Sequence, residues 1–257
     1  MNVPIIVIPG SGQLTPTDRG LLYGEGVFET VHVRPTGPWL LDAHLARLDR
    51  SAAALGIDVP PEVARLADGV THDDGALRLV VTPSTSFATL SPVPESIRRE
   101  RREGIRLITH EVGTERPPWS LSAAKTLSYA ENLAAKRWAA RQGADDLLWL
   151  AGGWALEGPT ANVVWLAGDT LCTVPAGTTG ILPGTTAAHL LERAAEVGLR
   201  AEERMITAAD LPGVDAIWLA SSLRGLAEAR SLDGRPRAAS PWTPRLLALL
   251  GFSRPPA

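Results

Sequence analysis

Residues 18–30 of the chain read DRGLLYGEGVFET, and this stretch sets the pattern of the N-terminal half. Its first part continues a loop at residues 10–20 in which glycine, proline, serine and threonine recur, as is typical of turns. Its second part begins an apolar segment, 26–34, with the composition of a β-strand. The apolar residues before the loop, 3–9, predict another strand, which we expect to be buried.

Predicted strands and helices follow one another on the C-terminal side of this stretch. Residues 43–55 show the apolar spacing of a helix that stops at Gly56. Further strands are predicted at 39–41, 76–82, 105–111, 146–150, 154–157, 163–166, 170–174, 201–204 and 216–221, and further helices at 60–67, 128–142, 185–197 and 244–250. The polar, proline-containing segment 83–103 shows little periodicity and predicts a domain boundary beyond it. We therefore expect a mixed α/β (α+β) fold with two domains, residues 1–110 and 111–257.

The composition excludes several classes of function. The net charge is −3, and the dense arginine run at 98–102 is interrupted by glutamate, so the chain offers no basic surface for nucleic acid. No stretch approaches the roughly 20 apolar residues of a membrane span, and the N-terminal apolar run is short for a signal peptide. A single cysteine, Cys172, permits no intrachain disulfide and no cysteine-based metal site. We expect a cytoplasmic protein without a metal.

Lysine is scarce in this chain. The 25 basic residues comprise 23 arginines and two lysines, Lys125 and Lys136, a bias that a GC-rich coding sequence explains. Lysine can lose its proton and act as a nucleophile, whereas arginine cannot. Lys125 lies three residues before Ser128, which with Glu131 matches a capping box at a helix start. The alternative for Lys125 is a solvated surface lysine.

Three further features could carry chemistry. Residues 180–186, GILPGTT, combine a turn with two hydroxyls, Thr185 and Thr186, at a helix start, which is suited to an anion such as phosphate. Arg47 could pair with a phosphate or a carboxylate, and Glu157 could pair with a protonated ring nitrogen. Each has an ordinary alternative as a capped helix, a surface arginine or a turn glutamate. Together with Lys125 they form the set of groups that pyridoxal 5′-phosphate requires.

Residues 18–30 resemble the N-terminal signature of the fold-type IV, class IV pyridoxal-phosphate enzymes. This family includes branched-chain aminotransferase, D-amino acid aminotransferase and 4-amino-4-deoxychorismate lyase, and the resemblance extends over about residues 1–225. It implies a small N-terminal α/β domain and a larger C-terminal domain with a mixed sheet or pseudo-barrel, with the cofactor between them. It also implies a homodimer that acts on a small molecule.

The resemblance assigns roles to single residues. Lys125 matches the lysine that forms the Schiff base with the cofactor and then serves as general base. With the domain boundary expected at residue 110, this lysine belongs to the C-terminal domain. Glu157 matches the glutamate at the pyridine nitrogen. The positions that match phosphate-binding residues are Arg47, Thr185, Thr186 and Ser222, and Asn162 matches a structural asparagine. Candidate substrate-binding residues are Arg224, Tyr23, Thr30 and Tyr129, with a surface position as the alternative for Arg224 and core packing for the others.

Two departures from the family pattern bear on the substrate. Ser128 stands where an asparagine often follows the lysine, and Ala161 stands where bacterial branched-chain aminotransferases have a glutamate. Residues 125–132 and 218–225 are similar to proteins named aminodeoxychorismate lyase. We therefore expect a lyase that releases pyruvate from 4-amino-4-deoxychorismate and forms 4-aminobenzoate for folate biosynthesis. The alternatives are an aminotransferase for D-amino acids or other small amine donors, and a protein that keeps the fold without catalysis.

Overall fold

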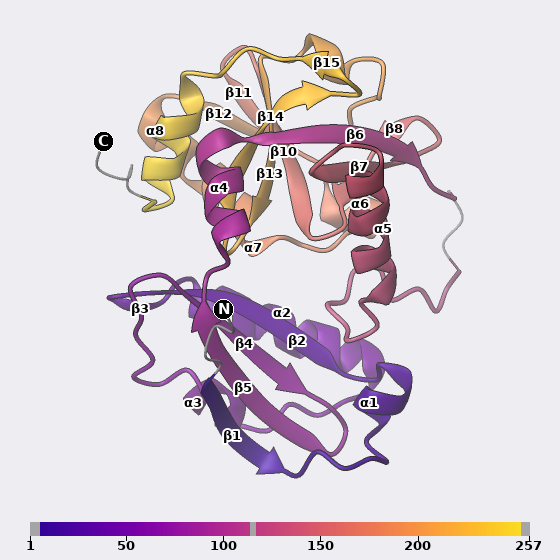
Figure 1. Cartoon of the computed structure of the whole chain (residues 1–257), viewed down its shortest axis with the longest axis vertical. Helices are drawn as coiled ribbons and strands as arrows, with labels where there is room; N and C mark the ends of the chain where they lie inside the picture. Colours follow the sequence, from indigo (N-terminus) through magenta and orange to yellow (C-terminus); the bar gives the residue numbers. More distant parts are fainter. Residues whose placement is uncertain (1–5, 114–116, 253–257) are drawn as a thin grey trace. The chain divides into compact units, whose positions relative to one another are not determined.

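The computed structural model describes residues 6–113 and 117–252, which form two compact units (Figure 1). The N-terminal unit contains the described residues up to Pro94 together with Leu121–Ala130. The C-terminal unit contains the described residues of Glu95–Ser120 and those from Glu131 onward. Within these ranges, none of the helices combines the length and the hydropathy needed to cross a bilayer.

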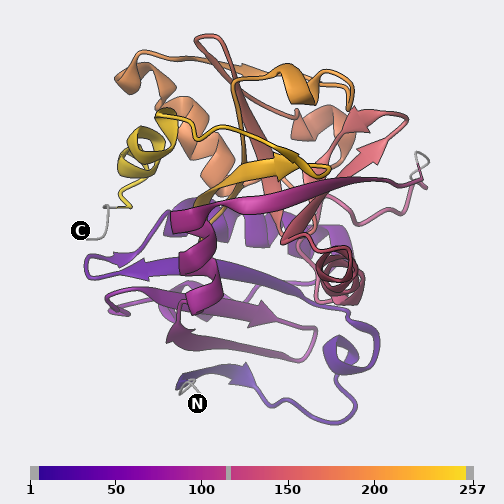
Figure 2. The ribbon, with the colours of Figure 1, turned by 45° about the horizontal axis from the view of Figure 1, so that its top comes forward.

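The N-terminal unit is built on an antiparallel sheet with the strand order β1-β5-β4-β2-β3, whose strands lie side by side in Figure 2. The strands are β1 (Ile6–Gly12), β2 (Val27–Arg34), β3 (Gly37–Pro38), β4 (Gly75–Val81) and β5 (Thr85–Pro92), and the helices are α1 (Arg19–Tyr23), α2 (Leu41–Leu55) and α3 (Glu62–Arg65). Leu48 and Ala52 of α2 are fully buried with Val27 of β2 and Val81 of β4. This apolar contact holds α2 against one face of the sheet.

The C-terminal unit contains a mixed sheet with the order β12-β11-β10-β13-β14-β6-β7-β8, to which β15 and β9 add at β14 and β10. Its strands are β6 (Ile105–Glu111), β7 (Asp146–Ala151), β8 (Trp154–Ala155), β9 (Glu157–Gly158), β10 (Ala161–Ala167), β11 (Thr170–Thr173), β12 (Arg200–Glu203), β13 (Ala216–Ser221), β14 (Gly225–Leu232) and β15 (Arg235–Pro236). Its helices are α4 (Glu95–Glu103), α5 (Ala130–Arg141, the first residue of which belongs to the N-terminal unit), α6 (Ala176–Thr179), α7 (Thr185–Glu192), α8 (Trp242–Leu249) and two short 3-10 helices, Ala194–Val197 and Leu211–Gly213. The pairs β11–β12, β14–β6 and β6–β7 are parallel.

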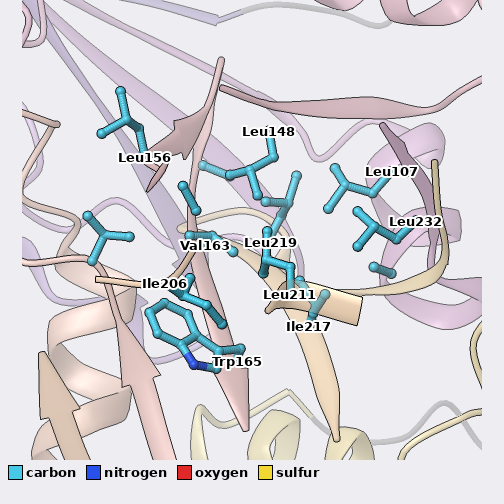
Figure 3. Packing of buried hydrophobic residues seen from close by; sticks show 14 of the residues in the cluster. Leu107, Leu148, Leu156, Val163, Trp165, Ile206, Leu211, Ile217, Leu219 and Leu232 are labelled. Atoms are coloured by element: carbon cyan, nitrogen blue, oxygen red, sulfur yellow. The ribbon is translucent and has the colours of Figure 1, made fainter. Parts of the chain in front are cut away.

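Large side chains of β10 and β13 fill the core of the C-terminal unit. Trp165, Ile217 and Leu219 are fully buried, and Figure 3 shows them among leucines from β6, β7 and β14. A sheet whose central strands carry apolar residues on both faces needs cover on both sides. The two sheets with their helices confirm the mixed α/β, two-domain fold expected from the sequence.

Three buried polar side chains connect α2 to β2. The Arg47 guanidinium donates through Nε and Nη2 to the two carboxylate oxygens of Glu29, both at 2.7 Å, and His44 Nδ1 lies 2.7 Å from the same carboxylate. Burial opposes the ionised form of Glu29, but the charge of Arg47 and the hydrogen bonds from Arg47 and His44 outweigh it and lower the pKa of Glu29 to about 2. Burial also lowers the pKa of His44, so the imidazole is neutral at pH 7.

Two predicted elements differ in the structure because of their surroundings. The first strand begins at Ile6 within the described residues and is an exposed edge strand rather than a buried one, with Ile6 58% and Val7 62% exposed. The segment 83–103 contains β5 and α4, although its polarity predicted neither. Ser86 of β5 is buried, and its hydroxyl accepts a hydrogen bond from Ser11 N. This bond satisfies the polar group, so a serine is tolerated inside the sheet.

The segment around Lys125 also differs from its prediction. Residues 121–130 belong to the N-terminal unit, so the division does not follow a single boundary at residue 110. The capping box is wrong, because α5 begins at Ala130 and the Ser128 hydroxyl lies instead near the carbonyl oxygens of Tyr23 and Gly24, at 3.5 and 3.4 Å. The predicted helix 185–197 is α7 followed by a 3-10 turn, and the hairpin partner of β2 lies at Gly37–Pro38.

Gly24 allows residues 121–130 to approach the N-terminal unit closely. It ends α1 with φ 70°, and a Cβ there would lie 3.1 Å from the Ser128 backbone. Gly56 ends α2 with φ 66° but has open space around its Cα. We expect Gly56→Ala to cost about 1–2 kcal/mol for the left-handed backbone alone, and Gly24→Ala to cost clearly more because the Ser128 segment must move. Urea unfolding of both variants tests this, and equal losses would contradict it.

The depressed pKa of Glu29 makes stability depend on pH. A carboxyl group whose pKa falls from 4.5 to about 2 on folding stabilises the protein above pH 4.5, and this contribution disappears as the pH falls toward 2. We expect the free energy of unfolding to fall by about 3 kcal/mol from this group over that interval. Glu29→Gln is less stable at pH 7 and loses less on acidification. Asp49→Asn, at an exposed position of α2, the helix that carries Arg47 and His44, is the matched control and keeps the wild-type slope.

Candidate active site

The backbone around Lys125 is hydrogen-bonded on both sides within the N-terminal unit. Lys125 N donates to the Ser51 hydroxyl of α2 at 3.0 Å, and Lys125 O accepts from Phe28 N of β2 at 3.0 Å. Leu127 N donates to Gly26 O, and Thr126 forms a bridge with Val27. Residues 125–127 therefore run alongside the start of β2, which fixes the position of the Lys125 Cα.

Two aromatic rings surround the Lys125 amine. Its Nζ lies 4.4 Å from the ring centroid of Phe28 and 5.4 Å from that of Tyr129, and the two rings meet edge to face at 5.1 Å. The lysine is half-buried, so its amine lies in a partly apolar environment. Tyr129, predicted from the sequence as a substrate residue, thus lies beside Lys125.

Arg78 of β4 is a residue that the sequence analysis did not select. Its guanidinium lies 3.7 Å from the ring centroid of Phe28, the ring that also contacts Lys125. Arg78 is directly opposite Thr30 across the β2–β4 ladder, so Thr30 and Arg78 share one face of the sheet. Burial lowers the pKa of Arg78. An arginine inside the apolar run ALRLVV, 76–81, was the signal in the sequence.

No carboxylate among the described residues forms an ion pair with Arg78, although the side chain is half-buried. Burying a cation without a counter-charge costs free energy, and a bound anion would recover it. A carboxylate bound by the Arg78 guanidinium would lie on the face of the sheet that carries Phe28. The Lys125 amine lies on the same face. The N-terminal unit therefore combines an amine that can act as nucleophile or base with a cation suited to a carboxylate.

Glu157 is buried in the C-terminal unit and is fixed by the turn that precedes α7. Its carboxylate accepts from Leu182 N at 3.1 Å and lies 3.4 Å from the Asn162 side-chain amide. The Asn162 amide also donates to Leu182 O at 2.8 Å. A Cβ at Gly184 would lie 1.8 Å from Asn162 Oδ1, so this position requires glycine. Glu157 and the 180–184 turn therefore form one hydrogen-bonded unit.

Helix α7 begins with Thr185 and Thr186, and both are buried. Thr186 Oγ1 has no hydrogen-bond partner among the described residues, although its surface is inaccessible to water. The first backbone N–H groups of a helix also lack partners within the helix and favour an anion. A buried hydroxyl without a partner at such a helix start is compatible with an anion, and the phosphate role of Thr185 and Thr186 stays a prediction.

The remaining predicted residues are spread over both units. Ser222 is half-buried in the turn between β13 and β14. Arg224 is 1% exposed, so the alternative of a surface arginine is wrong, and its Nη2 pairs with Asp146 at 2.9 Å and Glu100 at 2.7 Å. Its Nε and Nη1 have no hydrogen-bond partner among the described residues, and its role toward a substrate stays a prediction. Tyr23 is 66% exposed and lies under the Arg19 guanidinium. Arg47 pairs with Glu29 through two of the five N–H donors of a guanidinium.

Comparison with known proteins identifies the family. Residues 26–232 match the family described as amino-transferase class IV. The bifunctional aminodeoxychorismate lyase / D-amino acid transaminase of Mycobacterium tuberculosis is 36% identical, over 90% of this chain and 89% of that protein. D-alanine aminotransferase of Bacillus licheniformis is 28% identical, over 85% and 82% of the two chains. The PLP-bound structure of a hypothetical aminotransferase from Mycobacterium tuberculosis superimposes with a TM-score of 0.90 at 34% identity, covering 96% of this chain and 98% of the other. The chain belongs to the class IV aminotransferase family and is a pyridoxal-phosphate-dependent enzyme.

Proposed function

We propose that this enzyme is a 4-amino-4-deoxychorismate lyase, which converts its substrate to 4-aminobenzoate and pyruvate and so serves folate biosynthesis. The observation that carries the proposal is the Arg78 cation, which contacts the same ring as Lys125 and has no carboxylate partner among the described residues. The substrate of this lyase bears two carboxylates. The lyase activity in the name of the Mycobacterium tuberculosis relative supports the same conclusion.

The residues present fit pyridoxal phosphate. Lys125 supplies an amine on a backbone fixed by hydrogen bonds, and Thr186 supplies a buried hydroxyl without a partner at the start of α7. Glu157 supplies a buried carboxylate whose position is fixed by its bonds to Leu182 and Asn162, and a carboxylate is an acceptor for the N–H of a protonated ring nitrogen. We propose that Lys125, Glu157 and Thr186 bind one cofactor molecule, and that Arg47 and Ser222 also bind its phosphate group.

The chain's own groups then have separate tasks. When bound, the cofactor supplies an electron sink for negative charge at the carbon next to the substrate nitrogen. Lys125 Nζ removes the proton from that carbon as general base. Glu157 keeps a proton on the ring nitrogen, and Arg78 orients a substrate carboxylate. Loss of the enolpyruvyl group as pyruvate leaves a ring that becomes aromatic, which makes the reaction irreversible.

A second activity has support from a specific observation. The Mycobacterium tuberculosis relative is named for both lyase and D-amino acid transaminase, and the Bacillus licheniformis relative is named D-alanine aminotransferase. Both reactions begin with proton removal by the lysine, so the residues named here would serve either one. Formation of pyruvate from D-alanine and 2-oxoglutarate without formation of 4-aminobenzoate from aminodeoxychorismate would favour the aminotransferase. We further propose a cytoplasmic homodimer, as the family resemblance implies.

Lys125→Ala tests the catalytic lysine. We expect formation of 4-aminobenzoate and pyruvate from aminodeoxychorismate to fall by about 10³-fold or more, because both the nucleophile and the general base are lost. The absorbance of the lysine-bound cofactor disappears as well. Lys136→Ala removes the other lysine, whose amine pairs with Asp146, and keeps the activity. Wild-type protein that binds the cofactor but forms no 4-aminobenzoate would refute the lyase proposal.

Arg78→Gln tests the carboxylate site. Loss of a charge-assisted hydrogen bond of about 1.5–3 kcal/mol lowers kcat/KM for aminodeoxychorismate by about 10- to 150-fold. The cofactor spectrum is unchanged, because Arg78 contacts neither phosphate nor ring nitrogen in the proposal. Arg65→Gln, at an exposed position of the same unit, is the control. An unchanged kcat/KM in Arg78→Gln would refute the proposed contact between Arg78 and a substrate carboxylate.

A further inference from the structure

Helix α4 of the C-terminal unit contacts the turn between β13 and β14, which contains Ser222. Arg101 donates through Nε to Arg224 O at 3.1 Å and through Nη2 to Leu223 O. The chain reverses here between Ser221 and Gly225, which pair across the ladder. One guanidinium therefore bonds to two consecutive carbonyl groups directly after Ser222.

The residue before Arg101 contacts the same turn through a side chain. Glu100 lies 2.7 Å from Arg224 Nη2, and Asp146 of β7 lies 2.9 Å from the same nitrogen. Burial opposes the charge on Arg224, but the two carboxylates outweigh it and raise the pKa of Arg224, so the guanidinium remains charged. Because Arg224 is almost fully buried, removal of one partner leaves a poorly compensated charge in the interior.

Phe252 covers the turn together with Arg101. The Arg101 guanidinium lies 4.1 Å from the Phe252 ring centroid, and a Cβ at Gly225 would lie 2.7 Å from the same ring. Arg101 is thus held between an aromatic ring and two carbonyl groups, so its side chain has little freedom. Arg102, the next residue, pairs with Glu95 on the exposed surface of the helix instead.

We propose that Arg101 and Glu100 are positioning residues that fix the β13–β14 turn, and thereby place the Ser222 hydroxyl for binding the phosphate group. This inference depends on the proposed function, because the phosphate role of Ser222 belongs to it. Binding groups must be held within roughly 0.5 Å of their working geometry, and a turn joining two strands needs support to achieve this. Arg101 supports the turn at its backbone, and Glu100 supports it through Arg224.

The test compares two probes that differ only in the phosphate group. Apparent dissociation constants of pyridoxal 5′-phosphate and of pyridoxal are measured by absorbance on protein stripped of cofactor. We expect Arg101→Met to weaken pyridoxal-phosphate binding by about tenfold or more, as for the loss of a charge-assisted hydrogen bond, while pyridoxal binding changes little. Glu100→Gln shifts the ratio of the two constants in the same direction. Arg101→Lys keeps the charge but lacks the planar guanidinium that bonds to two carbonyl groups, so it gives an intermediate ratio.

Matched variants separate positioning from a general loss of structure. Arg102→Met leaves the ratio unchanged, and Ser222→Ala shifts it as Arg101→Met does. The Arg101→Met/Ser222→Ala double variant is no weaker than the weaker single variant, because both changes remove the same contact. Parallel weakening of both probes in Arg101→Met, with a lowered melting temperature, would overturn the proposal. An unchanged ratio in Ser222→Ala would overturn it too, and the 4-aminobenzoate assay decides separately whether the proposed reaction stands.

Discussion

The hydrogen bonds between residues 125–127 and the start of β2 are the constraint on which the N-terminal unit's part of the site depends. Residues 121–130 are far in sequence from β2, and the bonds at Phe28 N and Gly26 O attach them to it. The side chains of β2 then alternate between the two faces of the sheet. Phe28 and Thr30 lie on the face of Lys125 and Arg78, and Glu29 lies on the face of α2. One strand therefore orients the lysine and also holds the buried arginine of α2.

In the C-terminal unit, the Glu157 carboxylate fixes the turn that precedes α7 in a comparable way. The Glu157 carboxylate accepts from Leu182 N, and the Asn162 amide donates to Leu182 O, so both backbone polar groups of one residue in the turn are held. The turn leads through Gly184 into α7 and so determines where Thr185 and Thr186 begin the helix. A change at Glu157 consequently alters two things, the carboxylate itself and the start of α7. This coupling gives Asn162 and Gly184 a structural role, although neither residue takes part in the proposed chemistry.

The sequence predicted those parts of the fold that follow from local pattern. The strand at 26–34 and the helix at 43–55 were predicted within a few residues, because apolar spacing and a terminal glycine define them. β5 was missed because its serines and threonines are satisfied by hydrogen bonds from distant residues such as Ser11. The capping box at Ser128 was wrong because the hydroxyl lies near carbonyls of another segment. In each case a long-range partner, which no local window contains, decided the local structure.

Arg224 and Arg78 show that the sequence alone does not reveal which buried arginines already have a counter-charge. Arg224 was predicted as a substrate residue because a dicarboxylate substrate needs cationic groups, whereas Arg78, which lies inside an apolar strand, was not selected. The structure gives Arg224 two carboxylates and gives Arg78 an aromatic ring without a carboxylate among the described residues. Burial is greater at Arg224, and two carboxylates compensate its charge at Nη2, although its Nε and Nη1 have no hydrogen-bond partner among the described residues. Among the 23 arginines of the chain, the missing counter-charge is therefore what favours Arg78 as the cation for a substrate carboxylate in the proposed function.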